Sequence, residues 1–388
     1  RFDKGYIFLD EIGFIRDWAF EIKNFADEGN LNKTILFLTG SPLSIKEVEF
    51  LPGRHVEGNR YFLKPLTFRE FIKNLDITAI NCLTLDQKIR SEIKLLKKKL
   101  DKNFLTLEEP FEMMKEKFEI LLPFKDVLDF LLSCYMRTGG FPRPIEDYIE
   151  TKKIERRNYE TIINIIMSDL SKRGRSEDIA KQIFSGIIKR LGSSYDFRTL
   201  VKDTVEGINV NTIIDYLKIF NDSFLTQILY SYDFERKWSR IKGNKKIFFS
   251  DPFLFYSILS WLEGKDGFEM TEDVLIKEEK ISAILESVVF SSLSQTKEIP
   301  LIRPNSTFLW FYYDRRGEID FVFKQNSGKY LGIEVKYQPE VERKLLQLSH
   351  IRHYIILSRD TFKIENKIVI VPITLFLALT KKHMFNEP

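Results

Sequence analysis

Two carboxylates stand side by side after an apolar run near the start of the chain. Residues 6–9 (Tyr-Ile-Phe-Leu) lead into Asp10, Glu11, an isoleucine and a glycine. Apolar residues followed by polar ones are typical of a buried parallel strand that ends at the carboxyl edge of a sheet. There Asp10 would hold Mg²⁺ through water, and Glu11 would polarise a water molecule that attacks a phosphate group.

A second set of residues that could carry chemistry lies in the last hundred residues. Asp320 is followed by Glu334-Val-Lys336 on the next predicted strand. Side chains alternate along a strand, so Glu334 and Lys336 point the same way, and a hairpin brings Asp320 beside Glu334. Such carboxylates can hold Mg²⁺, which stabilises charge on a scissile phosphate. Lys336 would hold the attacking water or the developing charge. Glu286, from the preceding helix, can complete the ligand set.

The elements around the first pair form a strand, a helix and a strand. Residues 15–25 carry apolar residues at helical spacing, and residues 34–38 are a second apolar strand that ends at Thr39. This order predicts parallel strands joined by a right-handed crossover. The stretch that contains Asp10 and Glu11 resembles the Walker B motif of AAA+-type ATPases. The resemblance implies that Thr39 is a sensor residue near the γ-phosphate; a turn that caps the next helix is the alternative.

Further segments resemble the prokaryotic, largely archaeal, AAA+-like ATPases. They are Gly53-Arg54, residues 65–71 (Pro-Leu-Thr-Phe-Arg-Glu-Phe), residues 139–142 (Gly-Gly-Phe-Pro) and residues 248–252 (Phe-Phe-Ser-Asp-Pro). The resemblance implies that Arg54 is a finger or sensor arginine that touches the γ-phosphate, whereas a surface arginine is the alternative. Physically, residues 139–142 form a turn, because two glycines tolerate positive φ and proline ends it.

The middle of the chain has the pattern of a winged helix. Helices are expected over residues 176–191, 194–203 and 209–220, followed by strands over 224–231 and 246–250 that flank a basic tip, in which Lys246 also lies. A recognition helix and a basic wing predict a platform for double-stranded DNA. The alternative is a module for packing or for a protein partner. The predicted DNA contacts are Asn211, Thr212, Lys218, Arg236, Lys237, Arg240, Lys242 and Lys245.

The pattern Asp…Glu-x-Lys resembles the PD-(D/E)XK nuclease fold. The strands expected in that fold are found over residues 307–314, 317–323, 330–337 and 353–358. The resemblance implies metal ligation by Glu286, Asp320 and Glu334 and catalysis by Lys336. An aspartate and a Glu-x-Lys can also occur by chance on a solvated strand, and nuclease-like domains in this family can be degenerate.

Composition sets the broad class of the protein. The 388 residues are 30% charged and 44% hydrophobic, as in soluble globular proteins. The net charge of +4 permits a nucleic-acid partner without requiring one. Two cysteines without metal-ligand spacing fit a reducing compartment. No apolar run approaches the ~18 residues of a membrane span, and no signal peptide is seen, so a cytoplasmic protein without a membrane partner is expected.

The sequence therefore predicts an α/β chain of four parts. They are the C-terminal part of a P-loop AAA+-like core (1–75), a helical lid (76–150), a winged helix (151–252) and an α/β PD-(D/E)XK nuclease-like domain (253–388). No G-x-x-x-x-G-K-[ST] occurs in the 388 residues, and in the family this P-loop would lie upstream of residue 1. These residues alone are therefore expected to bind ATP weakly or not at all.

The predicted function is an AAA+-like ATPase, with ATP and Mg²⁺ as cofactors, coupled to DNA binding and to Mg²⁺-dependent phosphodiester cleavage. One alternative is a non-catalytic regulator that binds DNA or a partner, with degenerate ATPase and nuclease sites. Another is a nuclease whose ATPase half is inactive. AAA+-like ATPases often form rings, so a homo-oligomer is an expected assembly.

Overall fold

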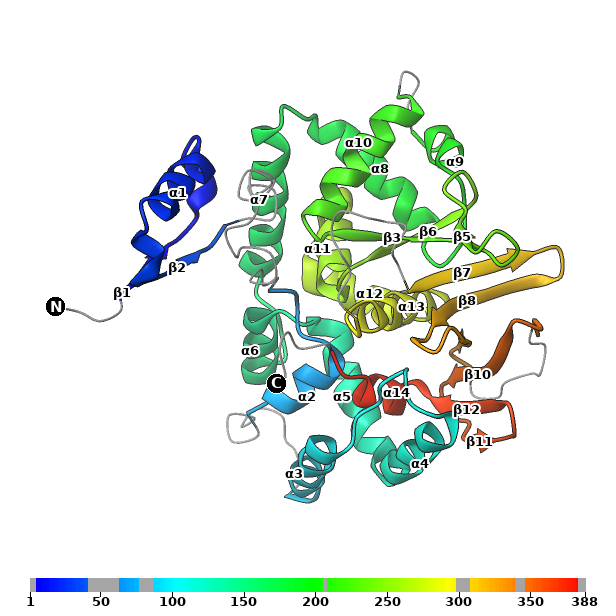
Figure 1. The fold of residues 1–388 in the computed structure, drawn as a ribbon. Coiled ribbons are helices and arrows are strands. Elements are labelled where there is room, and N and C mark those ends of the chain that lie inside the picture. Colours follow the sequence, from blue (N-terminus) through cyan, green and yellow to red (C-terminus); the bar gives the residue numbers. More distant parts are fainter. Residues whose placement is uncertain are drawn as a thin grey trace. The chain divides into compact units, whose positions relative to one another are not determined.

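The chain folds as a mixed α/β protein, as predicted, and forms two compact units. One unit comprises residues 1–64 and 215–226, and the other comprises residues 65–214 and 227–388. The computed structural model describes residues 5–40, 63–76, 87–204, 208–297, 308–338 and 346–382 (Figure 1). The predicted residue Arg54 lies outside the described residues.

The first unit contains the predicted strand–helix–strand. Strands β1 (Gly5–Leu9) and β2 (Thr34–Leu38) are parallel and flank helix α1 (Trp18–Asp27). A short 3₁₀ helix follows β1 (Ile12–Phe14), and another precedes β2 (Asn30–Asn32). Trp18 of α1 packs with Ile12 into a small core that Leu9 and Leu38 complete. This core holds the carboxyl ends of both strands beside one another.

The second unit begins with helices that cover the region predicted as a lid (76–150) and extend beyond it on both sides. They are α2 (Phe68–Asn74), α3 (Gln87–Lys102), α4 (Phe111–Leu121), a 3₁₀ helix (Leu122–Phe124), α5 (Lys125–Thr138), α6 (Pro142–Thr151) and α7 (Arg156–Lys172). The buried guanidinium of Arg69 in α2 donates hydrogen bonds to the carbonyls of Leu100, Asn103 and Ala378. Burial lowers the pKa of Arg69 to about 10. One side chain thus joins segments from both ends of the unit.

The elements of the predicted winged helix follow in the expected order. They are α8 (Glu177–Lys189), α9 (Phe197–Lys202), α10 (Val210–Asp222), β3 (Thr226–Tyr230), β4 (Tyr232–Asp233), β5 (Trp238–Ser239) and β6 (Lys245–Phe249). Strand β3 pairs with β6, and Tyr195 forms an antiparallel bridge with Lys245. The hairpin β4–β5 inside the wing was not predicted from the sequence.

The last part of the chain forms three helices, a six-stranded sheet and a final helix. The helices are α11 (Pro252–Glu263), α12 (Gly267–Leu275) and α13 (Glu278–Ser294). The sheet has the strand order β11-β12-β10-β9-β8-β7. Its strands, with the final helix, are β7 (Leu309–Asp314), β8 (Gly317–Lys324), β9 (Tyr330–Lys336), β10 (Ile351–Ser358), β11 (Lys363–Ile364), β12 (Ile368–Pro372) and α14 (Ile373–Leu379).

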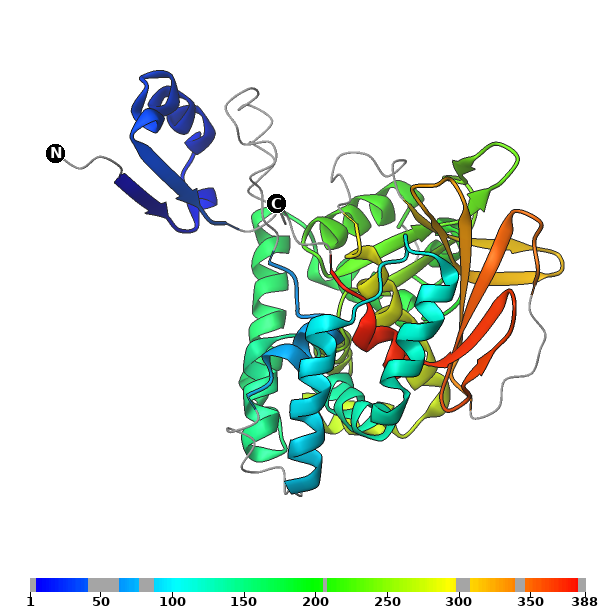
Figure 2. The same ribbon diagram turned by 60° about the horizontal axis from the view of Figure 1, so that its bottom comes forward.

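The hairpin expected between residues 317–323 and 330–337 is present in the sheet. Strands β7, β8 and β9 are antiparallel neighbours, and β10 lies parallel to β9 and to β12. Figure 2 shows these strands at one end of the unit, with most of its helices to one side. Helices α13 and α14 both contact the sheet.

Three of the family-like segments meet around one buried carboxylate. Gly140 accepts a hydrogen bond from the backbone of Leu66 at 2.9 Å and donates its own N–H to Asp251 Oδ2 at 2.7 Å. The other oxygen of Asp251 accepts the N–H of Phe253 and caps α11. A Cβ on Gly140 would lie 2.1 Å from the carbonyl oxygen of Leu66. Gly140 is therefore needed for close backbone approach.

A substitution at Gly140 can show whether the cost of a side chain there comes from close backbone packing or only from backbone strain. Gly140→Ala is expected to lower the free energy of unfolding by about 3 kcal/mol, because backbone atoms must shift. Gly174→Ala is the matched control. Gly174 has a φ of +59° and no atom within 4 Å of the added Cβ, so only strain of about 1 kcal/mol is expected. Equal losses in urea unfolding would contradict the packing argument.

Asp251 should make stability fall as pH rises. Burial raises the pKa of Asp251 from 3.8 to about 7, although backbone N–H groups donate to it. Between pH 3.8 and about 7, the folded chain keeps a proton on Asp251 that the unfolded chain has lost. The contribution of Asp251 to the free energy of unfolding therefore decreases by up to about 1.4 kcal/mol per pH unit. Asp251→Asn removes this slope. Urea unfolding from pH 4.5 to 8 should show that the difference in free energy of unfolding between the wild type and the variant becomes smaller as pH rises. A difference that stays constant over this range would contradict the prediction.

Candidate functional site

The carboxyl edge of β1 and β2 brings together three of the predicted residues. The hydroxyl of Thr39 donates a hydrogen bond to Asp10 Oδ1 and accepts one from the backbone N–H of Glu11 at 3.1 Å. The backbone N–H of Thr39 also donates to Leu9 at 2.9 Å. Glu11 has a left-handed backbone with φ of 50°. The turn after β1 is thus held against the end of β2.

Both carboxylates of this edge are exposed. Asp10 contacts a neutral hydroxyl, and hard carboxylate oxygens of this kind suit Mg²⁺ held through water. The geometry therefore fits the predicted metal and nucleotide roles of Asp10, Glu11 and Thr39, which stay predictions.

The six-stranded sheet brings together the second predicted set. The backbone N–H of Val335 donates to Asp320 Oδ2 at 2.9 Å, which places Asp320 next to Glu334. Lys336 Nζ lies 3.4 Å from Glu334 Oε2, so these two side chains point the same way, as predicted. Glu286 projects from α13 toward the same place, because it shares a cation with Asp320.

That cation is Lys246, which the sequence analysis placed in the basic tip of the wing. The side chain of Lys246 is only 1% exposed. Its ammonium lies 2.7 Å from Glu286 Oε1, 2.6 Å from Glu318 Oε1 and 2.9 Å from Asp320 Oδ1. The wing-tip prediction for Lys246 is wrong, because β6 is a buried strand and not part of a solvated turn.

Two members of this cluster were missed, although the sequence carries signals for both. Glu318 precedes Asp320 by two residues, so both lie on the same side of β8. Lys246 is followed by Ile-Phe-Phe, and a lysine in so apolar a strand needs a carboxylate partner. The second oxygen of Glu318 accepts a hydrogen bond from the hydroxyl of Ser194 at 3.0 Å. The cluster therefore joins β6, α13 and β8.

Burial and the charges of neighbouring groups both shift the pKa values of these residues. Burial would lower the pKa of Lys246, but attraction by Asp320, Glu286 and Glu318 outweighs it and raises the pKa well above its ordinary value. Burial raises the pKa of Glu286 to about 7 and, together with repulsion by Asp320, that of Glu334 to about 8. The nearby Lys246 keeps the pKa of Asp320 low in spite of its burial.

The cluster does not fit the predicted Mg²⁺. The ammonium of Lys246 fills the space between the carboxylates that would hold the ion. Both oxygens of Asp320 already accept hydrogen bonds, one from Lys246 and one from Val335. In the described part of the chain, no group of three or more His, Cys, Asp or Glu side chains is arranged to hold a metal ion. The predicted metal roles of Glu286, Asp320 and Glu334 are not supported by this geometry.

The predicted contacts of the wing divide into exposed and buried residues. Arg236, Lys237 and Lys242 are exposed, and Arg240 is half-buried beside Asp233 at 3.4 Å. Lys245 is buried, and its Nζ lies 4.2 Å from the ring centre of Phe197. The prediction that Lys245 contacts DNA is therefore wrong. Sequence reasoning also missed Trp238, which is 52% exposed in the hairpin with the basic residues.

The predicted recognition helix begins with a side-chain cap. The side chain of Asn209 accepts a hydrogen bond from the backbone N–H of Thr212 at 2.9 Å, so Asn209 caps the helix. Thr212 is half-buried and its hydroxyl also bonds to Asn209 at 3.3 Å. Asn211 and Lys218 are exposed. The roles of Asn211, Thr212 and Lys218 in DNA binding stay predictions.

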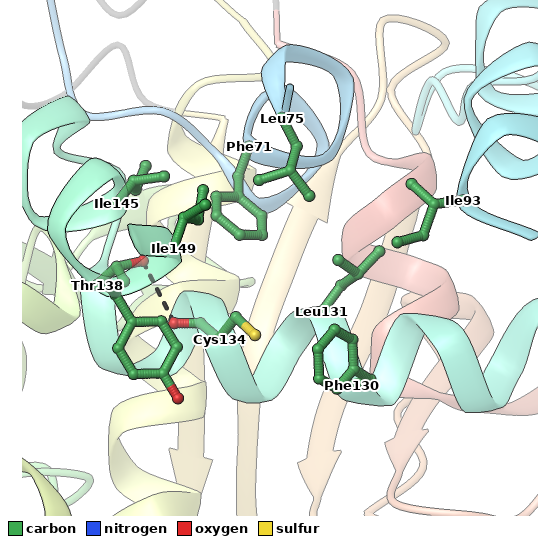
Figure 3. A pocket seen from close by; sticks show the side chains of 10 residues that line it. Phe71, Leu75, Ile93, Phe130, Leu131, Cys134, Thr138, Ile145 and Ile149 are labelled. Atoms are coloured by element: carbon green, nitrogen blue, oxygen red, sulfur yellow. Dashed lines mark hydrogen bonds between the residues drawn. The ribbon is translucent and has the colours of Figure 1, made fainter. Parts of the chain in front are cut away.

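A small apolar cavity among the helices carries no chemistry. It has a volume of about 10 Å³ and is lined by Phe71, Ile93, Leu131, Cys134 and neighbouring residues (Figure 3). This space holds at most about one water molecule. Cys134 is a buried free cysteine, and burial raises the pKa of its thiol to about 11, as is typical of structural cysteines.

Comparisons with known proteins agree with the first of the two sites. Residues 1–72 match the family described as an AAA domain. Residues 130–265 and 282–376 match two domains of unknown function, DUF8612 and DUF4143. A relative in Methanocaldococcus jannaschii, the uncharacterized protein MJ1637, is 24% identical over 97% of this chain and 71% of its own length. No solved structure matches the chain.

These comparisons support an AAA-type ATPase at the start of the chain. The AAA match includes Asp10, Glu11 and Thr39 and ends within α2. None of the matched descriptions mentions a nuclease or DNA binding. No helix of the described residues has the length and apolar character needed to cross a membrane.

Proposed function

We propose that this chain belongs to an AAA-type ATPase and contributes its Walker B and sensor residues. The observation that carries the proposal is the hydrogen bond between Thr39 and Asp10 at the carboxyl edge of two parallel strands. This edge lies within the match to the AAA domain. It is also the edge at which sheets of this kind bind their ligands.

Each residue of this edge has a role that its contacts support. The hydroxyl of Thr39 orients Asp10 by holding Oδ1, which leaves Oδ2 to hold Mg²⁺ through water. Bound Mg²⁺ would neutralise charge on the phosphates of ATP. Glu11 is exposed next to Asp10, and its carboxylate can accept a proton from the attacking water. The P-loop, which the 388 residues do not contain, would hold the phosphates.

Glu11→Gln tests the catalytic part of the proposal in a form of the protein that binds ATP. The variant is expected to bind ATP normally and to hydrolyse it about 10²- to 10⁴-fold more slowly, because the general base is lost. Glu21→Gln, an exposed glutamate in α1, is the matched control and should keep wild-type activity. Steady-state phosphate release gives both values. Wild-type turnover by Glu11→Gln would refute the assigned role.

We propose as a second function that the wing binds nucleic acid. The support is the exposed group of Arg236, Lys237 and Lys242 on and after the turn of the hairpin β4–β5. Exposed cations on a hairpin suit contacts with phosphates. The side chain of Trp238 adds an aromatic surface on which a base can stack. Helices α8, α9 and α10 precede this hairpin in the order of a winged helix.

The double variant Arg236→Ala and Lys237→Ala tests the wing. Its affinity for a DNA duplex should fall, and the slope of log K against log salt should decrease by about 1 for each lost phosphate contact. Lys98→Ala with Lys99→Ala, two exposed lysines of α3, is the control with the same loss of charge. Fluorescence anisotropy at several salt concentrations measures both quantities. Equal slopes for both double variants would point away from the wing.

Phosphodiester cleavage is not part of the proposed function. Its predicted residues are brought together, but a lysine fills the place of the metal. A homo-oligomeric assembly and a cytoplasmic location stay predictions.

A further inference from the structure

We infer that Lys246 is the resident cation of the nuclease-like carboxylate cluster, and that the cluster fastens the wing strand β6 to α13 and β8 without a metal ion. The cluster comprises Lys246, Glu286, Glu318 and Asp320. In place of an exchangeable ion it contains a cation that is covalently part of the chain. The inference does not depend on the ATPase or on DNA binding.

Five of the six carboxylate oxygens around Lys246 have a polar partner with the lysine in place. An ammonium has three N–H donors, and Lys246 has three carboxylate oxygens within 2.6–2.9 Å. The remaining oxygen of Asp320 accepts from Val335, and that of Glu318 accepts from Ser194. A Mg²⁺ ion needs oxygens at about 2.0–2.1 Å in octahedral geometry. It could bind here only if the ammonium left.

Rotation of the side chain alone would not bring Lys246 to solvent. Its neighbours in β6 are buried, and Phe248 stacks on Phe290 of α13 with ring centres 4.7 Å apart. The backbone of Lys245 exchanges hydrogen bonds of 2.8 and 3.0 Å with Tyr195. The ammonium of Lys246 also lies 5.8 Å from the ring centre of Phe311. Release of Lys246 therefore requires β6 itself to move.

The interface that surrounds the cluster is continuous with the sheet. Trp310 of β7 donates its indole N–H to the hydroxyl of Ser239 at 2.8 Å. The hydroxyls of Tyr232 and Tyr330 are 2.8 Å apart, and Tyr232 packs against Trp310. The wing hairpin is thus docked on the six-stranded sheet, and Lys246 adds a charged contact from β6 to the same sheet.

Two substitutions of Lys246 separate a resident cation from a metal site. All measurements use an Asp10→Asn background, which removes the other candidate carboxylate. Lys246→Ala leaves unpaired buried carboxylates and an open space, so its melting temperature should fall by roughly 10 °C and Mn²⁺ should restore part of the loss. Lys246→Met fills the space without a charge. It should lose similar stability and gain no Mn²⁺ site.

Electron paramagnetic resonance of Mn²⁺ counts the bound ions. The chain with Lys246 intact should bind no Mn²⁺ at the cluster, and its melting temperature should not change with Mn²⁺. Lys246→Ala should bind one ion, and adding Asp320→Asn to it should abolish that ion.

Two results would overturn the inference. One is a bound Mn²⁺ in the chain with Lys246 intact that disappears in Asp320→Asn. The other is Lys246→Met with unchanged stability. If Lys246→Ala does not fold, the intact chain and Lys246→Arg test whether the cluster binds a metal ion. Lys246→Arg keeps the positive charge, so this variant is expected to fold and to bind no Mn²⁺.

Discussion

The structure of the second unit depends on one buried ammonium surrounded by carboxylates. A buried charge is tolerated only when it is paired and hydrogen-bonded, and removal of one partner from such a pair typically destabilises a protein by about 3–5 kcal/mol. Lys246 takes its partners from α13 and β8, which are 40 and 74 residues further along the chain. A slip of β8 by one residue would place Ile319 where a carboxylate is needed. The ion cluster therefore selects one strand register in addition to any net stability that it provides.

A second buried carboxylate organises the helical half of the same unit. Asp251 accepts backbone hydrogen bonds from Gly140 and Phe253, and Gly140 in turn pairs with Leu66. Three segments by which the chain resembles an ATPase family thus meet around one buried carboxylate. Their residue types follow from close backbone packing and helix capping. The segment with Asp10 and Glu11 is of a different kind, because its carboxylates are exposed at a sheet edge.

The sequence predicted those features that local patterns determine. Apolar runs located β1 and β2, and alternation in β8 and β9 placed Asp320 beside Glu334. The position of Lys246 could not be predicted in this way, because its partners are distant in sequence. Consecutive lysines next to a predicted wing were interpreted as a solvated tip. In the structure β6 is covered on both sides, so Lys245 lies over Phe197 while Lys246 reaches the cluster.

The two carboxylate groups of the chain differ in the kind of cation that they suit. Asp10 is exposed and fixed by the neutral hydroxyl of Thr39, so its free oxygen can exchange one cation for another. Asp320 is buried, and both of its oxygens accept hydrogen bonds from the chain itself. An enzyme that turns over needs its metal and substrate to enter and leave. By that criterion the edge of β1 and β2 meets one requirement of catalysis, and the buried carboxylates of α13 and β8 are suited to hold β6 in place.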